Sequence, residues 1–287
     1  MSLDLVRVLN ERAGCDLELV ELVEQGQSGA AYVRWPDGRD AVVTTALASM
    51  GRMRQTAEVL AGVKALGLPV PEHQFLFQLD DGTVAVVQER LPGSSAVVAE
   101  VTTVDAIIAM NERFAGLLSD RPDIPAPRLS LGRPGDPISS APLERHSPRS
   151  RRLLRLIQEA GGDGTGEMVG DDLVHVDLTV PNVLFAQDGS ISGVIDWSYG
   201  VARGDRHYGI VKLLHTLSFD AASPDADHHP SSEAVRWVNQ FVEATLDSAT
   251  LRRYWAHQTL NMLYWTIRAG NESAIDTYVE LGESKLA

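Results

Sequence analysis

The sequence of 287 residues predicts an α+β fold, and two features of its hydrophobic pattern support this prediction. Up to about residue 91, short apolar segments alternate with turns that contain Gly and Asp, which is typical of antiparallel strands. From residue 103 onward, most apolar residues recur at the spacing of amphipathic helices. Strands followed by helices are the pattern of an α+β protein. With 44% hydrophobic residues, the chain can form one bilobal unit or two domains.

The N-terminal elements follow from alternation and turn residues. We expect a short helix over residues 3–14 and a long helix over 52–66, which ends at Gly67 and the prolines after it. The expected strands cover residues 17–23, 30–35, 40–45, 75–79 and 83–87.

The C-terminal elements are mainly helical by the same criteria. The expected helices cover residues 103–118, 149–160, 210–219, 233–246 and 251–269. Residues 121–150 hold seven of the fourteen prolines, so we expect an irregular connection there. The aromatic residues of the last two helices are spaced for packing in a helical core.

The segment from His175 to Asn182 reads H-x-D-L-x-x-x-N, the pattern of a kinase catalytic loop. In such a loop, Asp177 faces the hydroxyl that receives the phosphoryl group, and Asn182 faces Mg²⁺. Fourteen residues after Asn182, an apolar strand ends in Asp196. We therefore predict Asp177 as the catalytic residue and Asn182 and Asp196 as the metal ligands.

A predicted hairpin explains how the two metal ligands meet. Residues 183–187 and 190–195 have strand character, and Asp188-Gly189 between them is a strong turn signal. Such a hairpin returns Asp196 to the neighbourhood of Asn182. A lone H-x-D would favour ordinary loop residues, whereas the whole pattern with its hairpin favours phosphotransfer.

These residues carry a family resemblance. The segment resembles the aminoglycoside phosphotransferase family, whose usual form is H-G-D-L-x-x-x-N-x-L followed by V-I-D-W and G-D. This chain has Val176 where that family commonly has Gly, and it has Gly204-Asp205 after Ile195-Asp196-Trp197. The resemblance implies a two-lobed protein-kinase-like fold with an N-terminal antiparallel sheet plus helix and a mainly helical C-terminal lobe. It also implies that His175 braces the loop and that Asp205 is structural.

The resemblance divides the chain into two lobes. Residues 1–91 would form the nucleotide-binding lobe, with a hinge at 88–93, and residues 92–287 the catalytic and substrate-binding lobe. Adenine would pair with backbone groups near Glu89 and Leu91 of the hinge.

A glycine-containing loop lies between the first two strands. Its residues Gly26, Ser28 and Gly29 can bring backbone amides close to the phosphates of ATP or GTP, although the same residues also suit a plain hairpin. In kinases the third strand carries a phosphate-binding Lys that pairs with a Glu on the next helix, where this chain has Glu58.

The third strand departs from the kinase pattern because it contains no Lys. It reads Ala-Val-Val-Thr-Thr, and the three lysines of the chain are Lys64, Lys212 and Lys285. Thr44 or Thr45 occupies the position, or Arg52 or Arg54 reaches the phosphates from the helix. In lacking this Lys, the chain resembles the tuberactinomycin branch of the family, which acts on viomycin and capreomycin.

Composition limits the partners and the location. The net charge of −14 favours a cationic substrate and disfavours nucleic acid. Cys15 is the only cysteine, which excludes an internal disulfide and favours a reducing compartment. No apolar run approaches the ~20 residues that span a bilayer, and the chain does not open with a secretory pattern. We expect a cytoplasmic protein with no membrane partner.

Together these observations predict an ATP- or GTP-dependent, Mg²⁺-dependent O-phosphotransferase that inactivates a cationic antibiotic. The partner would be a small molecule or a cyclic peptide, with a tuberactinomycin such as capreomycin or viomycin as the first hypothesis. The alternatives are an aminoglycoside phosphotransferase, a kinase of a small metabolite and, from another class, a non-catalytic nucleotide-binding module.

Overall fold

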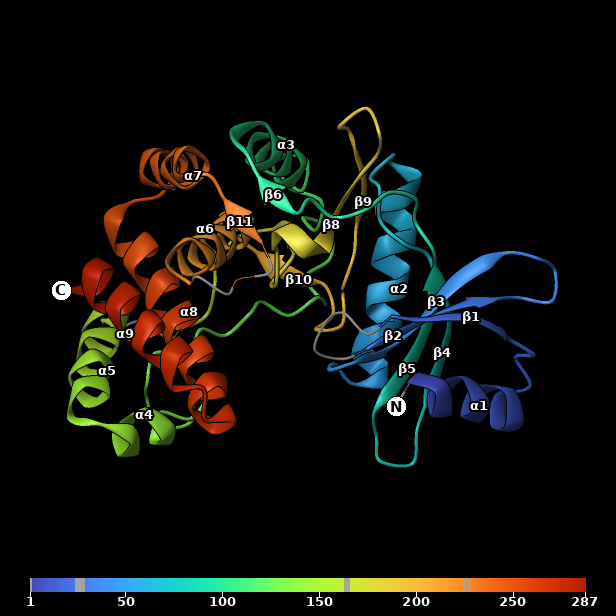
Figure 1. The fold of residues 1–287 in the computed structure, drawn as a ribbon, viewed down its shortest axis with the longest axis horizontal. Coiled ribbons are helices and arrows are strands. Elements are labelled where there is room, and N and C mark those ends of the chain that lie inside the picture. The colour runs from blue at the N-terminus through green and yellow to red at the C-terminus, as the bar shows by residue number, and fades with distance from the viewer. Residues whose placement is uncertain (1, 24–28, 163–165, 224–225, 227) are drawn as a thin grey trace. The chain divides into compact units, whose positions relative to one another are not determined.

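The computed structural model describes residues 2–23, 29–162, 166–223, 226 and 228–287. The chain forms two compact units. Unit 1 combines Met1–Ser95 with Asn182–Val201, and unit 2 combines Ala96–Pro181 with Ala202–Ala287. Figure 1 shows the elements of each unit.

Unit 1 contains a five-stranded antiparallel sheet with the strand order β1-β2-β3-β5-β4. Its strands are β1 (Glu18–Val23), β2 (Ala30–Arg34), β3 (Asp40–Ala46), β4 (His73–Gln78) and β5 (Val84–Glu89). Its helices are α1 (Ser2–Ala13) and α2 (Met50–Ala65), and a separate hairpin is formed by β8 (Val183–Phe185) and β9 (Ile191–Val194).

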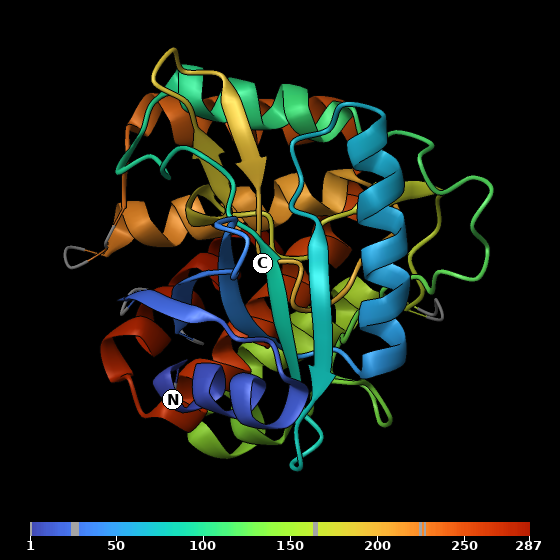
Figure 2. The same cartoon turned by 90° about the vertical axis from the view of Figure 1, so that its right-hand side faces the viewer.

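The alternation of β5 assigns one helix to each face of the sheet. Ala85 and Val87 are buried together with Leu5 and Leu9 of α1, whereas the intervening Val84 and Val86 are buried in a second cluster with Met53 of α2. Side chains at successive strand positions point to opposite faces, so both faces of β5 are apolar. Figure 2 shows α1 and α2 on the two sides of this sheet.

Unit 2 is mainly helical. Its helices are α3 (Val101–Glu112), α4 (Ala141–His146), α5 (Pro148–Gly161), α6 (His207–Ala222), α7 (Ser232–Thr245), α8 (Ser248–Ala269) and α9 (Glu272–Leu286). Its short strands are β6 (Val98–Ala99) with β11 (His229–Pro230), and β7 (Asp172–Val174) with β10 (Ala202–Gly204). The 3₁₀ turn η1 (Val180–Asn182) lies where the chain passes from unit 2 to unit 1.

Local signals explain where the helices of unit 2 begin and end. α5 starts with a capping box, in which the side chains and backbone amides of Ser147 and Ser150 pair reciprocally, and with Pro148 at its first turn. α8 begins at Asp247, whose carboxylate accepts from two backbone amides, and ends at Gly270 with φ +70°. The segment 121–150 is less irregular than expected, because α4 and the start of α5 lie within it.

Candidate active site

The loop that carries Asp177 follows β7 in unit 2. His175 is 2% exposed, and its ring nitrogen Nδ1 accepts a hydrogen bond from the Asp177 amide at 3.3 Å. The buried imidazole thus supports the backbone of the loop from inside, as the family resemblance implies. The side chain of Asp177 is 30% exposed, and its Oδ1 lies 3.1 Å from Nζ of Lys212 on α6.

The hairpin β8–β9 of unit 1 has the predicted form. Val183 pairs with Val194, and the Ile195 amide donates to the carbonyl of Asn182 at 2.9 Å. The turn at Asp188 and Gly189 closes the two strands, which are slightly shorter than predicted. The backbone next to Asp196 is therefore returned to Asn182, as the sequence predicts.

Asp196 has an unusual backbone conformation for a residue that is not glycine. Its φ is +61°, and its side chain is exposed at the end of β9. Left-handed conformations are uncommon for residues other than glycine, although Asp and Asn adopt them more readily than most, and they are concentrated at functional sites. The Ser198 amide donates to Asp196 Oδ1 at 3.3 Å, which stabilises the turn locally.

The loop after Asp196 is attached to β3 and α2 within unit 1. The amides of Leu47 and Ala48 donate to the Ser198 carbonyl at 2.9 and 3.0 Å, and the Val201 amide donates to Thr56 Oγ1 at 3.0 Å. Arg52 donates through Nη2 to the Val201 carbonyl. Burial lowers the pKa of this guanidinium. Arg52 therefore holds the loop together, and in this structure its Nη2 is directed to a backbone carbonyl.

The expected phosphate-binding positions are only partly described. Gly26 and Ser28 lie outside the described residues, whereas Gly29 is described and has a φ of +61°, a conformation that favours glycine. Thr44 lies half-buried on β3 opposite Val86, with its hydroxyl 3.5 Å from the Thr45 carbonyl. Glu58 of α2 is exposed.

The segment predicted as a hinge, residues 88–93, begins at the end of β5. The carboxylate of Glu89 pairs with Lys64 of α2 and accepts from the Glu72 amide at 3.1 Å, and the Glu89 amide donates to the Glu72 carbonyl at 2.8 Å. Leu91 lies against Gly193 of β9, where an added Cβ would be 3.0 Å from Leu91 Cδ1. The side chain of Glu89 thus has a structural use within unit 1.

Hydrogen bonds attach the segment after β5 to the β8–β9 hairpin, which precedes Asp196. Ser94 and Phe185 exchange backbone hydrogen bonds of 3.2 and 2.9 Å, and Ser192 Oγ donates to the Pro92 carbonyl at 2.6 Å. Gly93 has a φ of +101°, and a Cβ there would lie 2.5 Å from the Phe185 carbonyl oxygen. This close approach requires glycine.

Asp205 belongs to a partly buried network in unit 2. Its Oδ1 accepts from the His207 amide at 3.0 Å and lies 2.9 Å from the His207 ring, and its Oδ2 accepts from the Tyr254 hydroxyl at 3.0 Å. Burial alone would raise the pKa of Asp205, but the hydrogen bonds from His207 and Tyr254 outweigh it and lower the pKa. This arrangement agrees with the structural role that the resemblance implies.

The structure also shows a contact of Asp177 that no sequence motif indicates. Lys212 occurs within the apolar run of α6, between Val211 and Leu213, and its ammonium reaches Asp177. A lysine within an apolar helical run is the only signal that could have indicated this pairing. The sequence separation of 35 positions between Asp177 and Lys212 hides it from any local pattern.

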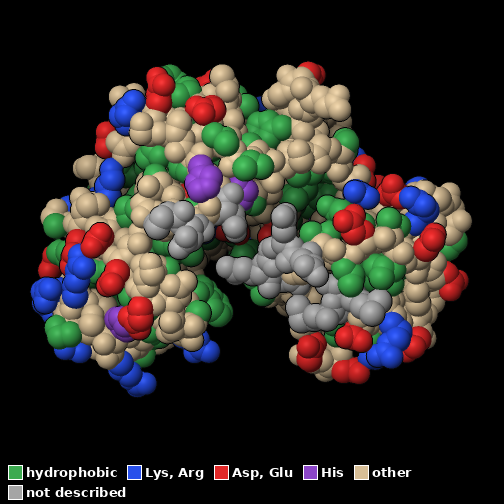
Figure 3. Space-filling view, viewed as in Figure 1, with side chains coloured by type: hydrophobic (Ala, Val, Ile, Leu, Met, Phe, Trp, Pro, Cys, Tyr) green, Lys and Arg blue, Asp and Glu red, His purple; other side chains and the backbone are tan. Residues whose placement is uncertain are grey.

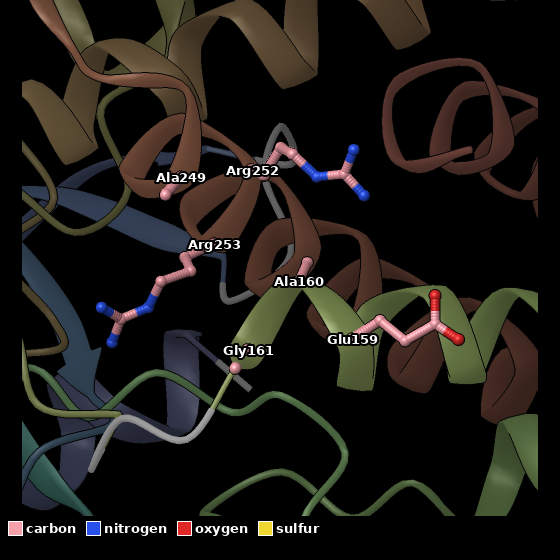
Figure 4. Close-up of a pocket in the computed structure, with 7 residues that line it drawn as sticks. Glu159, Ala160, Gly161, Ala249, Arg252 and Arg253 are labelled. Atoms are coloured by element: carbon pink, nitrogen blue, oxygen red, sulfur yellow. The ribbon is translucent and has the colours of Figure 1, made fainter.

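Other surface features lie elsewhere. A pocket of about 490 Å³ in unit 2 lies where α5 ends and α8 begins, and Figure 4 shows Arg252, Arg253 and Glu159 at its edge. None of the predicted site residues that the structure describes lines this pocket. On the face shown in Figure 3, basic side chains are interspersed with acidic ones.

Comparisons with known proteins support the assignment of the fold. Residues 171–256 match the sequence model of the phosphotransferase enzyme family. This segment includes the loop of Asp177, the hairpin and α6, and the match supports the predicted phosphotransferase class there. No curated protein matches the chain by sequence.

Solved structures resemble the whole chain at low identity. Aminoglycoside phosphotransferase APH(4)-Ia is 18% identical with a TM-score of 0.66, over 100% of this chain and 98% of that one. Amicoumacin kinase hAmiN, solved with AMP-PNP, Ca²⁺ and Ami, is 14% identical with a TM-score of 0.67, over 99% and 96%. The GDP and kanamycin complex of APH(2")-IIIa is 16% identical with a TM-score of 0.59, over 99% and 98%. These likenesses confirm the predicted α+β, kinase-like fold class.

Proposed function

We propose that this protein is an ATP- or GTP-dependent O-phosphotransferase whose acceptor is a hydroxyl group of a cationic antibiotic. The observation that carries the proposal is the pair of local structures around the motif. Asp177 stands on a loop supported by a buried His175, and the hairpin returns Asp196, in a left-handed conformation, to the backbone of Asn182.

In the proposed reaction, Asp177 orients the acceptor hydroxyl and receives its proton. The acceptor oxygen forms a bond to the γ-phosphorus, the bond from that phosphorus to the β–γ bridging oxygen breaks, and the nucleoside diphosphate leaves with the electron pair. Such reactions depend on positioning and charge neutralisation more than on a strong base. A partly exposed carboxylate with a fixed backbone suits this task.

Asn182 and Asp196 are the proposed ligands of Mg²⁺. Their amide and carboxylate oxygens are the hard donors that this ion prefers, and it is usually bound through one or two carboxylates plus nucleotide phosphates. Among the described residues, no group of three or more His, Cys, Asp or Glu side chains is placed to hold a metal. A site that the nucleotide completes agrees with this donor set. When bound, the ion neutralises charge on the phosphates.

The proposed nucleotide contacts are those predicted from the sequence. They comprise the loop with Gly26, Ser28 and Gly29, the strand position of Thr44, and the backbone of the hinge near Glu89 and Leu91. We retain residues 1–91 as the nucleotide lobe, 88–93 as the hinge and 92–287 as the catalytic and substrate lobe. Residues 182–201 belong to unit 1, so Asn182 and Asp196 lie in the same compact unit as the proposed nucleotide lobe.

Two antibiotic classes are the leading acceptors. Aminoglycosides come first because enzymes that act on them share the fold. Tuberactinomycins such as capreomycin and viomycin follow because β3 lacks a Lys. The net charge of −14 favours a polycation of either class. The proposal includes a cytoplasmic location, where ATP and GTP are available. Among the described residues, no helix has the length and apolar character needed to cross a bilayer.

The test is a screen for transfer of labelled γ-phosphate from ATP and from GTP to both antibiotic classes and to amino alcohols and amino sugars, read by mass. We expect one product heavier by one phosphate. We further expect Asp177→Ala to abolish transfer while the fold and nucleotide binding persist. Transfer only to a metabolite would identify a metabolic kinase. Nucleotide binding with neither phosphate transfer nor slow nucleotide hydrolysis would identify a binding module. Unchanged turnover of Asp177→Ala would refute the catalytic assignment.

A further inference from the structure

Lys212 lies almost entirely inside unit 2. It belongs to the buried face of α6, and its side chain is 9% exposed. Lysines are rarely buried to this extent without a partner, because removing an ammonium from water is costly. Only three of the 25 Lys and Arg residues of the chain are lysines, so a buried lysine in α6 is not expected from the frequency of lysine alone.

The contacts of the ammonium identify its partner. Nζ lies 3.1 Å from Asp177 Oδ1, and the sulfur of Met262 on α8 is 3.7 Å away. A thioether is only a weak acceptor, so the carboxylate is the principal partner. Among the described residues, the acidic side chain in ion-pair contact with Lys212 is therefore that of Asp177, the proposed proton acceptor.

The titratable groups around Lys212 reinforce this pairing. Burial, with the positive charge of Lys212 as the next cause, lowers the pKa of His215 to about 3. Burial also lowers the pKa of His257 to about 4, with Lys212 again among the causes. Both imidazoles are neutral at pH 7. Neither imidazole offers a negative charge to Lys212, and Asp177 is the acidic group that lies at 3.1 Å from its ammonium.

The two partners differ in accessibility, which separates their roles. The side chain of Asp177 is 30% exposed, whereas that of Lys212 is 9% exposed. The carboxylate can meet a ligand, and the ammonium supports it from the protein interior. Lys212 is therefore placed to act through Asp177.

We propose that Lys212 is a positioning residue for phosphotransfer: its ammonium fixes Oδ1 of Asp177 and holds this carboxylate in the orientation needed for the acceptor hydroxyl. The inference rests on the proposed function. A fixed cation beside the carboxylate is a preorganised charge, which needs no rearrangement during the reaction. Lys212 donates no proton in this scheme, and the hydroxyl proton still moves to Asp177.

The primary test compares Lys212→Met, Lys212→Arg and the surface control Lys285→Met. Met retains most of the stem but removes the charge, and Arg retains the charge with a different donor geometry. Lys285 is exposed and donates to Asn239 of α7. We expect Lys212→Met to lower kcat about 10²-fold, the scale of a general acid–base contribution. The KM for nucleotide should change less than about 2-fold, Lys212→Arg should recover part of kcat, and Lys285→Met should match the wild type.

A double-mutant cycle with Asp177→Asn tests whether Lys212 acts through Asp177. Residues that work as a unit are strongly non-additive. In the Asp177→Asn background, Lys212→Met should therefore cost less than about 2-fold further in kcat, measured by product mass after long incubation. An equal loss in both backgrounds would overturn the inference, as would full kcat in Lys212→Met.

Separate controls distinguish a loss of folding, and a failure of the proposed phosphotransferase function, from a failure of the Lys212 proposal. Circular dichroism and thermal melting of every variant establish that the fold persists. If Lys212→Met does not fold, Lys212→Arg decides: a fall in kcat at constant KM supports positioning, and a lower melting temperature with unchanged kcat overturns it. Wild-type protein that transfers no phosphate to any screened compound would overturn both proposals, whereas active wild type with active Lys212→Met would overturn only this one.

Discussion

The left-handed backbone at Asp196 allows stability and function to be separated at one position. The perturbations are Asp196→Asn, Asp196→Gly and Asp196→Ala. The φ of +61° is tolerated by Asp and Asn, is free of strain in Gly, and costs about 1 to 2 kcal/mol for a residue with an ordinary Cβ. Because the Asp196 side chain is exposed, none of these changes removes core packing.

The expected free energies of unfolding follow from that conformation. Asp196→Asn should lie within about 0.5 kcal/mol of the wild type, since it keeps the left-handed preference and an acceptor for the Ser198 amide. Asp196→Ala should be less stable by about 1 kcal/mol or more. Asp196→Gly should fall near the wild type, because relief of strain is offset by the larger entropy of the unfolded chain.

Nucleotide binding should follow a different order. If Asp196 is a ligand of Mg²⁺, all three variants lose the carboxylate and should bind ATP or GTP at least about 10-fold more weakly in the presence of Mg²⁺, the scale typical of metal-site disruption. Urea denaturation and calorimetric titration measure the two properties. Wild-type Mg²⁺-dependent affinity in Asp196→Asn would refute the metal assignment. Equal stability of the Ala and Gly variants would refute the strain argument.

Two further predictions test the packing around the site. The pKa of His215 is about 3 in the folded protein and 6.5 in the unfolded chain, so between these values the imidazole binds a proton mainly in the unfolded state. Its contribution to the free energy of unfolding therefore falls as the pH drops below 6.5. Between pH 7 and 5, His215→Leu should therefore lose about 2 kcal/mol less stability in urea titrations than the wild type, and an equal loss would contradict the reasoning. Gly93→Ala should destabilise unit 1 by more than about 2 kcal/mol and weaken nucleotide binding, because its Cβ would overlap the Phe185 carbonyl. Gly82→Ala has a similar φ of +87° but open space around the added Cβ, so it isolates the backbone strain, and equal effects at both positions would exclude the overlap.

The elements most visible in the sequence are those whose signals are local. The hairpin depends on Asp188-Gly189 between two apolar segments, and this information lies within a dozen residues. The catalytic-loop motif is equally compact. For the same reason, the strands of unit 1 and the helices α5, α6, α7 and α8 of unit 2 agree with their predicted positions to within three residues. The helix predicted over 103–118 is α3, which already ends at Glu112, and no helix range was predicted for α9.

The features that could not be predicted depend on contacts between distant segments. Nothing near Lys212 in the sequence indicates Asp177, because the pairing arises only when α6 packs against the loop after β7. The ion pair between Lys64 and Glu89 likewise forms only because the last turn of α2 packs against the end of β5. The role of Arg52 was open among several possibilities, and the Val201 carbonyl that it contacts is 149 positions away.

The three lysines differ in exposure and in partner, and these differences predict which of them affects the reaction. Lys285 is exposed, and the Lys64–Glu89 pair is about one-third exposed on both sides, at 34% and 32%. Exposed ion pairs contribute only about 0 to 1 kcal/mol, because water and salt screen them. Lys212 is different, since its 9% exposure removes most of that screening and its partner is Asp177. Loss of such a cation leaves the carboxylate without its compensating charge, so an effect on the chemistry of Asp177 is expected at Lys212 and not at the other two lysines.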